Sequence, residues 1–144
     1  MATLKKAIST IKAFNFELSL LKVVKDNDNV IIDLNTDDQL FKFGIDSAGQ
    51  KLAPYRSSEY AQLKAQLNPN RVTDLKLEGD FYKGFRVDAD KFPIYVTSID
   101  DKAAKLVAKY GEDIFGLTQE NKGEFSDQIL QDVQQEIRQK LGIS

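Results

Sequence analysis

Residues 126–141 read S-D-Q-I-L-Q-D-V-Q-Q-E-I-R-Q-K-L, and this stretch decides the helical part of the fold. Four of its five apolar residues recur every four positions, at Ile129, Val133, Ile137 and Leu141. That spacing places them on one face of an α-helix. Gly142 follows directly, and glycine is the residue that most often ends a helix. The pattern predicts a C-terminal helix over about 126–141 that buries one face.

The N-terminal segment, residues 3–24, carries a second apolar stripe. Its members stand three or four positions apart, at Leu4, Ile8, Ile11, Phe14, Leu18 and Leu21. This spacing predicts one long N-terminal helix, which the polar cluster at 26–29 ends. Residues 1–6 begin like a signal peptide, but polar residues interrupt the stretch that follows. We therefore expect the chain to be mature from its first residue.

The chain between these two helices alternates strand and helix signals. Apolar and β-branched runs predict strands at 30–34, 72–77, 85–87 and 93–97, the last two forming a hairpin around the polar residues 88–91. Together they predict a small mixed or antiparallel sheet of about four strands.

Central helices are expected where capping residues precede apolar periodicity. Thr36 and Gln39 match a capping box, so a short helix should run to Phe43 and stop at Gly44. Further helices are predicted over about 57–67, capped by Ser57 or Ser58, and over about 100–110, with a helical turn at 81–85. Residues 45–55 are expected to be irregular, because 46–49 is a turn signal. With the terminal helices, these elements predict a single α+β domain over 1–144, with one or two central helices.

The composition argues against catalysis. The 144 residues include no Cys, no His and no Trp, and the net charge is −2. The missing Cys excludes cysteine nucleophiles and thiolate metal sites, and the missing His removes the commonest general base and the commonest metal ligand. No phosphate-binding loop and no nucleophile motif is present. We expect a protein that is not an enzyme and that uses no cofactor and no metal.

Three carboxylate clusters have simpler explanations than metal binding. The run 26–28 resembles the start of a calcium loop, but Ile31 and Asp37 stand where that loop needs Gly and Glu. The pairs at 37–38 and 100–101 fall at predicted helix starts, where the helix dipole favours negative charge. No apolar run is long enough to span a bilayer, and the net charge argues against specific nucleic-acid binding.

The two ends of the chain carry opposite charge. Residues 1–25 hold five lysines, including Lys5, Lys6 and Lys12, against Glu17, a balance of +4. Residues 112–144 hold seven acids against three basic residues, a balance of −4. One interpretation is two ordinary solvated faces. The other is complementary ends that meet between neighbouring subunits, where such charges would steer and select partners.

Aromatic residues are dense in the region 46–85. They are Tyr55, Tyr60, Phe81, Tyr82 and Phe85. Aromatics in an irregular region form either a satellite core under a long loop or an interface patch. Both interpretations stay open, so the five residues are candidates for an assembly interface together with Lys5, Lys6 and Lys12.

The same region resembles a known family. Three segments carry the resemblance: G-I-D-S-A-G-Q-K-L-A-P-Y at 44–55, Y-A-Q-L-K at 60–64 and D-L-K-L-E-G-D-F-Y-K-G-F at 74–85. Their order and spacing are similar to those of small virion-morphogenesis or tail-completion proteins of tailed bacteriophages, which are related to head–tail connector components. The segment 109–118 resembles versions from phages of Bacteroidetes-type hosts. The similarity covers roughly 30–140 and departs at 78–79, where the family usually has Thr-Gly.

The resemblance implies a non-enzymatic structural subunit of the virion neck or tail. Such a subunit is made in the host cytoplasm and assembles as a ring of copies between the portal and the tail. Its expected partners are other copies of itself and portal, connector or tail proteins. The alternative is a phage-encoded binding module or regulator that is not part of the particle.

Overall fold

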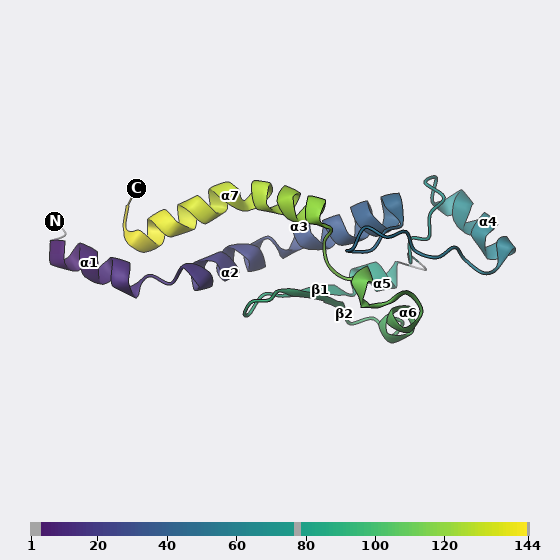
Figure 1. Ribbon diagram of the computed structural model, residues 1–144, viewed down its shortest axis with the longest axis horizontal. Helices are drawn as coiled ribbons and strands as arrows, with labels where there is room; N and C mark the ends of the chain where they lie inside the picture. The colour runs from purple at the N-terminus through teal and green to yellow at the C-terminus, as the bar shows by residue number, and fades with distance from the viewer. Residues whose placement is uncertain (1–3, 77–78, 144) are drawn as a thin grey trace.

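The two terminal segments of the chain pack against each other. In the computed structural model, which describes residues 4–76 and 79–143, the chain begins with α1 (Leu4–Ala13) and α2 (Phe16–Asp26) and ends with α7 (Gln119–Leu141). α7 runs antiparallel to α1 and α2, so both ends of the chain lie at one end of an elongated molecule (Figure 1). The predicted C-terminal helix is confirmed, and Gly142 ends it in a left-handed conformation.

The bounds of both terminal helices differ from the prediction, and in each case a capping residue is the reason. The expected single N-terminal helix is interrupted, because the side chain of Asn15 caps α2 by accepting from the Leu18 amide at 3.1 Å. Asparagine is better suited to this position than to a helix interior. α7 starts at Gln119 rather than near 126, since the Thr118 hydroxyl accepts from the Asn121 amide at 3.1 Å.

The predicted strand at 30–34 is wrong. The chain there is α3 (Asp28–Asp33), which continues directly into a π-helix, η1 (Leu34–Phe43). Ile31 is buried, and Val30 and Leu34 pack against the same core cluster. Because residues 30, 31 and 34 also share one face of a helix, contacts with the core override their β-propensity. The predicted capping box is also wrong, since Thr36 lies inside the helix and donates to the Ile32 carbonyl at 2.8 Å.

Two buried amides hold η1 to the segment that precedes α7. Asn35 donates to the Ile114 carbonyl at 3.0 Å and accepts from the Gly116 amide at 2.7 Å. Gln39 donates to the Gly116 carbonyl and accepts from the Thr118 amide, both at 2.9 Å. Both side chains are fully buried, so every such bond replaces one that water would otherwise supply.

The middle of the chain contains the predicted irregular segment and the first central helix. Gly44 ends η1 with φ +63°, and a side chain there would collide with Val72, so glycine is required. The turn at 46–49 is confirmed, as Gly49 donates to the Asp46 carbonyl at 3.0 Å. α4 (Ser58–Leu67) follows, and its predicted cap is confirmed because the Ser57 hydroxyl accepts from the Tyr60 amide.

The sheet has two strands rather than about four. A helical turn, α5 (Asp80–Lys83), leads into β1 (Phe85–Asp88), which pairs antiparallel with β2 (Tyr95–Ser98) as the predicted hairpin. The predicted strand at 72–77 is wrong over 72–76, and residue 77 lies outside the described residues. Leu75 is buried with φ +59°, a conformation that cannot continue a strand. The class therefore stays α+β with a smaller sheet.

Two apolar clusters make up the core. α6 (Ala103–Tyr110) and η2 (Glu112–Ile114) complete the fold after the hairpin. One cluster lies between α2, α3 and α7, with Val24, Ile31 and Ile129 among its buried members. The other joins η1, α5, β1 and η2, with Leu40 and Phe81 completely buried.

Candidate functional site

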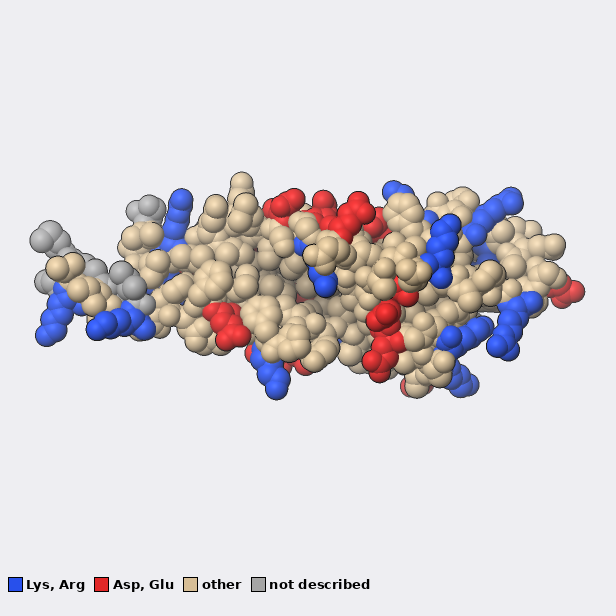
Figure 2. Space-filling view, viewed as in Figure 1, with Lys and Arg blue, Asp and Glu red and all other residues tan. Residues whose placement is uncertain are grey.

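α1 presents an exposed basic surface at the end of the molecule. Leu4 and Ile8, one turn apart, are 78% and 43% exposed. The sequence-predicted residues Lys5, Lys6 and Lys12 also lie exposed on this helix, which carries no acidic residue. Figure 2 shows basic side chains at this end and also at the opposite end of the molecule, with most of the acidic ones between them. α1 thus combines apolar and basic side chains at the tip of the chain.

Two lysines of the basic N-terminal segment form ion pairs within their own chain. Lys22 on α2 lies 3.0 Å from Asp26 and 3.6 Å from Glu136 on α7. Lys25 lies 2.8 Å from Asp90. These two lysines connect α2 to α7 and to the hairpin loop. Lys5 and Lys12 of α1 lie exposed on the surface at the end of the molecule.

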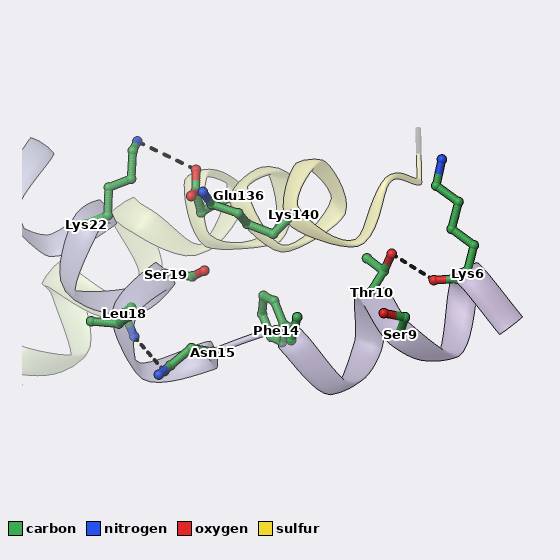
Figure 3. A pocket seen from close by; sticks show the side chains of 11 residues that line it. Lys6, Ser9, Thr10, Phe14, Asn15, Leu18, Ser19, Lys22, Glu136 and Lys140 are labelled. Carbon is green, nitrogen blue, oxygen red and sulfur yellow. Dashed lines mark hydrogen bonds and ion pairs between the residues drawn. The ribbon is translucent and has the colours of Figure 1, made fainter. Parts of the chain in front are cut away.

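A cleft of about 570 Å³ separates α1 and α2 from the end of α7 (Figure 3). Phe14, Leu18 and Lys22 line the wall formed by α2 and the segment before it, and Glu136 and Lys140 line the wall formed by α7. Glu136 is 7% exposed, and its Oε1 atom has no hydrogen-bond partner among the described residues. Its second oxygen faces Lys22, so this cleft holds an ion pair between α2 and α7 beside the hinge-like break at Phe14 and Asn15.

The sequence-predicted aromatic residues divide into core and partly exposed side chains. Phe81 and Phe85 are 0% and 1% exposed, and their rings lie 5.0 Å apart in an edge-on contact. The interface interpretation is therefore corrected for these two residues, which pack inside their own chain. Tyr55, Tyr60 and Tyr82 are half-buried, and the rings of Tyr55 and Tyr60 form an edge-on pair 5.0 Å apart.

Tyr55 belongs to a buried charged network that the sequence did not reveal. At its centre Asp74, which is 0% exposed, pairs with Lys64 of α4 at 2.9 Å. The Asp74 carboxylate also accepts from Asn68 at 2.8 Å, from the Tyr55 hydroxyl at 3.1 Å and from the Lys76 amide at 2.9 Å. The network fastens α4 and the segment before it to the core. Lys64 and Asp74 stand in polar stretches, where a sequence pattern indicates solvent exposure.

The tyrosine hydroxyls of this network remain protonated donors. Burial, and next the charge of Asp74, raise the pKa of the Tyr55 hydroxyl above its ordinary value. The same two causes, in the same order, raise the pKa of Tyr82, whose hydroxyl donates to the Asp74 carbonyl. A satisfied carboxylate with protonated tyrosines around it stabilises the fold, and its chemistry is that of a structural anchor.

The network predicts a specific loss of stability in acid. Burial alone would raise the pKa of Asp74, but the Lys76 amide, Asn68 and Lys64 outweigh it and hold the pKa below its ordinary value of 3.8. A carboxyl whose folded-state pKa is lowered stabilises the folded state fully above the unfolded-state pKa, and this stabilisation fades as pH falls through the folded-state pKa. We expect the free energy of unfolding, measured in urea, to fall more steeply below pH 4 in the parent than in Asp74→Asn. Equal slopes in the two proteins would contradict this assignment.

The described residues contain neither a membrane-spanning helix nor a metal-binding cluster. None of the helices within 4–76 and 79–143 combines the length and apolar character needed to cross a bilayer. Across the same ranges, no three Asp or Glu residues gather closely enough to hold a metal ion. The chain matches no protein-family model, no curated protein and no solved structure.

Proposed function

We propose that this protein is a non-enzymatic structural subunit of a bacteriophage virion, in the neck (head–tail connector) or tail-completion region. It assembles as a ring with other copies of itself, between the portal and the tail. Its further partners are portal, connector or tail proteins, and it acts without a cofactor. The sequence resemblance over roughly 30–140 motivates the choice of a virion protein.

The observation that carries the proposal is the exposed surface of α1. Exposed apolar area that becomes buried on association contributes roughly 25 cal/mol per Å², so Leu4 and Ile8 favour a bound state. The lysines of α1 add selectivity, because charges at an interface steer partners together and reject wrong ones. A surface that combines both features is typical of a protein that assembles.

The proposal is tested by locating the protein in phage particles. We expect quantitative mass spectrometry of purified virions of the encoding phage to detect the chain at several copies per particle. A non-structural protein of the same phage serves as the control for lysate contamination. If the chain is no more abundant in particles than that control protein, the proposal is wrong. That result would favour a phage-encoded binding module that acts outside the particle.

A further inference from the structure

A second surface, between η1 and α7, is hollowed and acidic, whereas α1 is exposed and basic. Between η1 and α7 lie two adjoining hollows of about 380 and 400 Å³, which share Leu34 and Asp38. Val30, Leu34 and Phe43 provide apolar surface along them, and the Phe43 side chain is 47% exposed. We call the two hollows together the η1/α7 groove. It is a groove of mixed apolar and polar lining that the described part of its own chain leaves open.

The rim of the groove is strongly acidic. Its carboxylates are Asp33, Asp37, Asp38, Glu120 and Glu124, against the single cation Lys42. The carboxylate of Asp38 accepts from Asn121 at 3.0 Å. The other four acidic residues are exposed. The groove therefore favours an occupant that presents an apolar stripe flanked by positive charge.

α1 has this chemistry. Leu4 and Ile8 are spaced as one helical stripe, while Lys5 and Lys12 lie seven residues apart and so share a neighbouring face. The ten α-helical residues of α1 span about 15 Å. The apolar side chains of α1 therefore match the apolar part of the groove, and its lysines match the acidic rim.

The groove cannot be filled by α1 of the same chain. α1 lies at the end of the elongated molecule where both termini are found, whereas η1 lies beyond the far end of α2 and α3 (Figure 1). Building on the proposed self-assembly, we propose that α1 of one copy docks in the η1/α7 groove of the next copy. Such a contact joins different surfaces head to tail, and a head-to-tail contact generates a ring when its rotation closes.

A charge exchange tests this contact on the full chain. Reversing the donor, Lys5→Glu with Lys12→Glu, removes two attractions and adds two repulsions, so self-association should weaken about tenfold. Reversing the acceptor, Asp33→Lys with Asp37→Lys, should have the same effect. Mixing the two variants should restore association between unlike chains. Sedimentation velocity of each variant and of the mixture, at low salt, measures these changes.

A matched control and a geometric test accompany the exchange. Lys91→Glu with Lys105→Glu makes the same change of charge at exposed sites away from α1, and it should leave association unchanged. Because the chain has no cysteine, Ile8→Cys protein mixed with Phe43→Cys protein should form mixed disulfide dimers on mild oxidation. Ile99, which is 68% exposed on the connection to α6, provides the comparison as Ile99→Cys.

The outcomes separate this contact from the proposed function. Restoration on mixing, together with preferred Ile8–Phe43 cross-linking, supports docking in the groove. A parent protein that stays monomeric overturns it, as does a mixture that fails to recover. Equal cross-linking of Ile8→Cys to Phe43→Cys and to Ile99→Cys also overturns it. In each of these cases the virion measurement still decides independently whether the chain is a structural subunit.

Discussion

Replacing Asp74 with alanine is expected to destabilise the protein by about 3–5 kcal/mol. The substitution leaves the ammonium group of Lys64, whose side chain is only 7% exposed, without its counter-charge. It also removes the acceptor of the Asn68 amide and of the Tyr55 hydroxyl. Urea denaturation followed by far-UV circular dichroism measures the change in the free energy of unfolding.

The Lys64 partner provides the control for this result. Because the penalty arises from an uncompensated buried charge, Asp74→Ala combined with Lys64→Met should recover a large part of the loss. Asp90→Ala breaks the exposed pair with Lys25 and should leave the stability within experimental error. An Asp74→Ala protein as stable as the parent would show that the pair contributes no anchoring, and would contradict the assignment.

Phe81→Ala is expected to cost about 3–5 kcal/mol, because it opens a cavity in the second core cluster. The Phe81 ring is completely buried and contacts the rings of Phe85 and Phe115 at centroid distances of 5.0 and 5.9 Å. The expected readout is a lower urea midpoint of the isolated protein at low concentration, where association does not contribute.

Tyr95→Ala on β2 is the matched control for this aromatic truncation. The Tyr95 side chain is 56% exposed, so its removal should change the free energy of unfolding by less than about 1 kcal/mol. If Phe81 acted at a subunit interface instead, its truncation would leave monomer stability unchanged and would weaken association alone. That pair of results would restore the interface interpretation of Phe81.

Local chemistry in the sequence was sufficient for several elements. The four-residue spacing from Ile129 to Leu141 predicted the C-terminal part of α7, and Ser57 predicted the start of α4, because caps and apolar periodicity act within a few residues. The hairpin at 85–98 followed from two β-prone runs around a polar loop. The basic character of α1 was also evident from the sequence, because Lys5, Lys6 and Lys12 fall within a ten-residue segment that holds no acidic residue.

Tertiary contacts decided the structure of segments whose local sequence is compatible with two different states. Residues 30–34 satisfy a strand pattern and a helix face equally, and the core against α7 selects the helix. The Lys64–Asp74 pair lies inside the molecule only because Asn68, Tyr55 and the chain around Leu75 surround it. The η1/α7 groove joins segments about 80 residues apart in the chain, so no local pattern marks it. A sequence alone determines what each segment prefers, whereas burial, which depends on distant partners, determines which preference is realised.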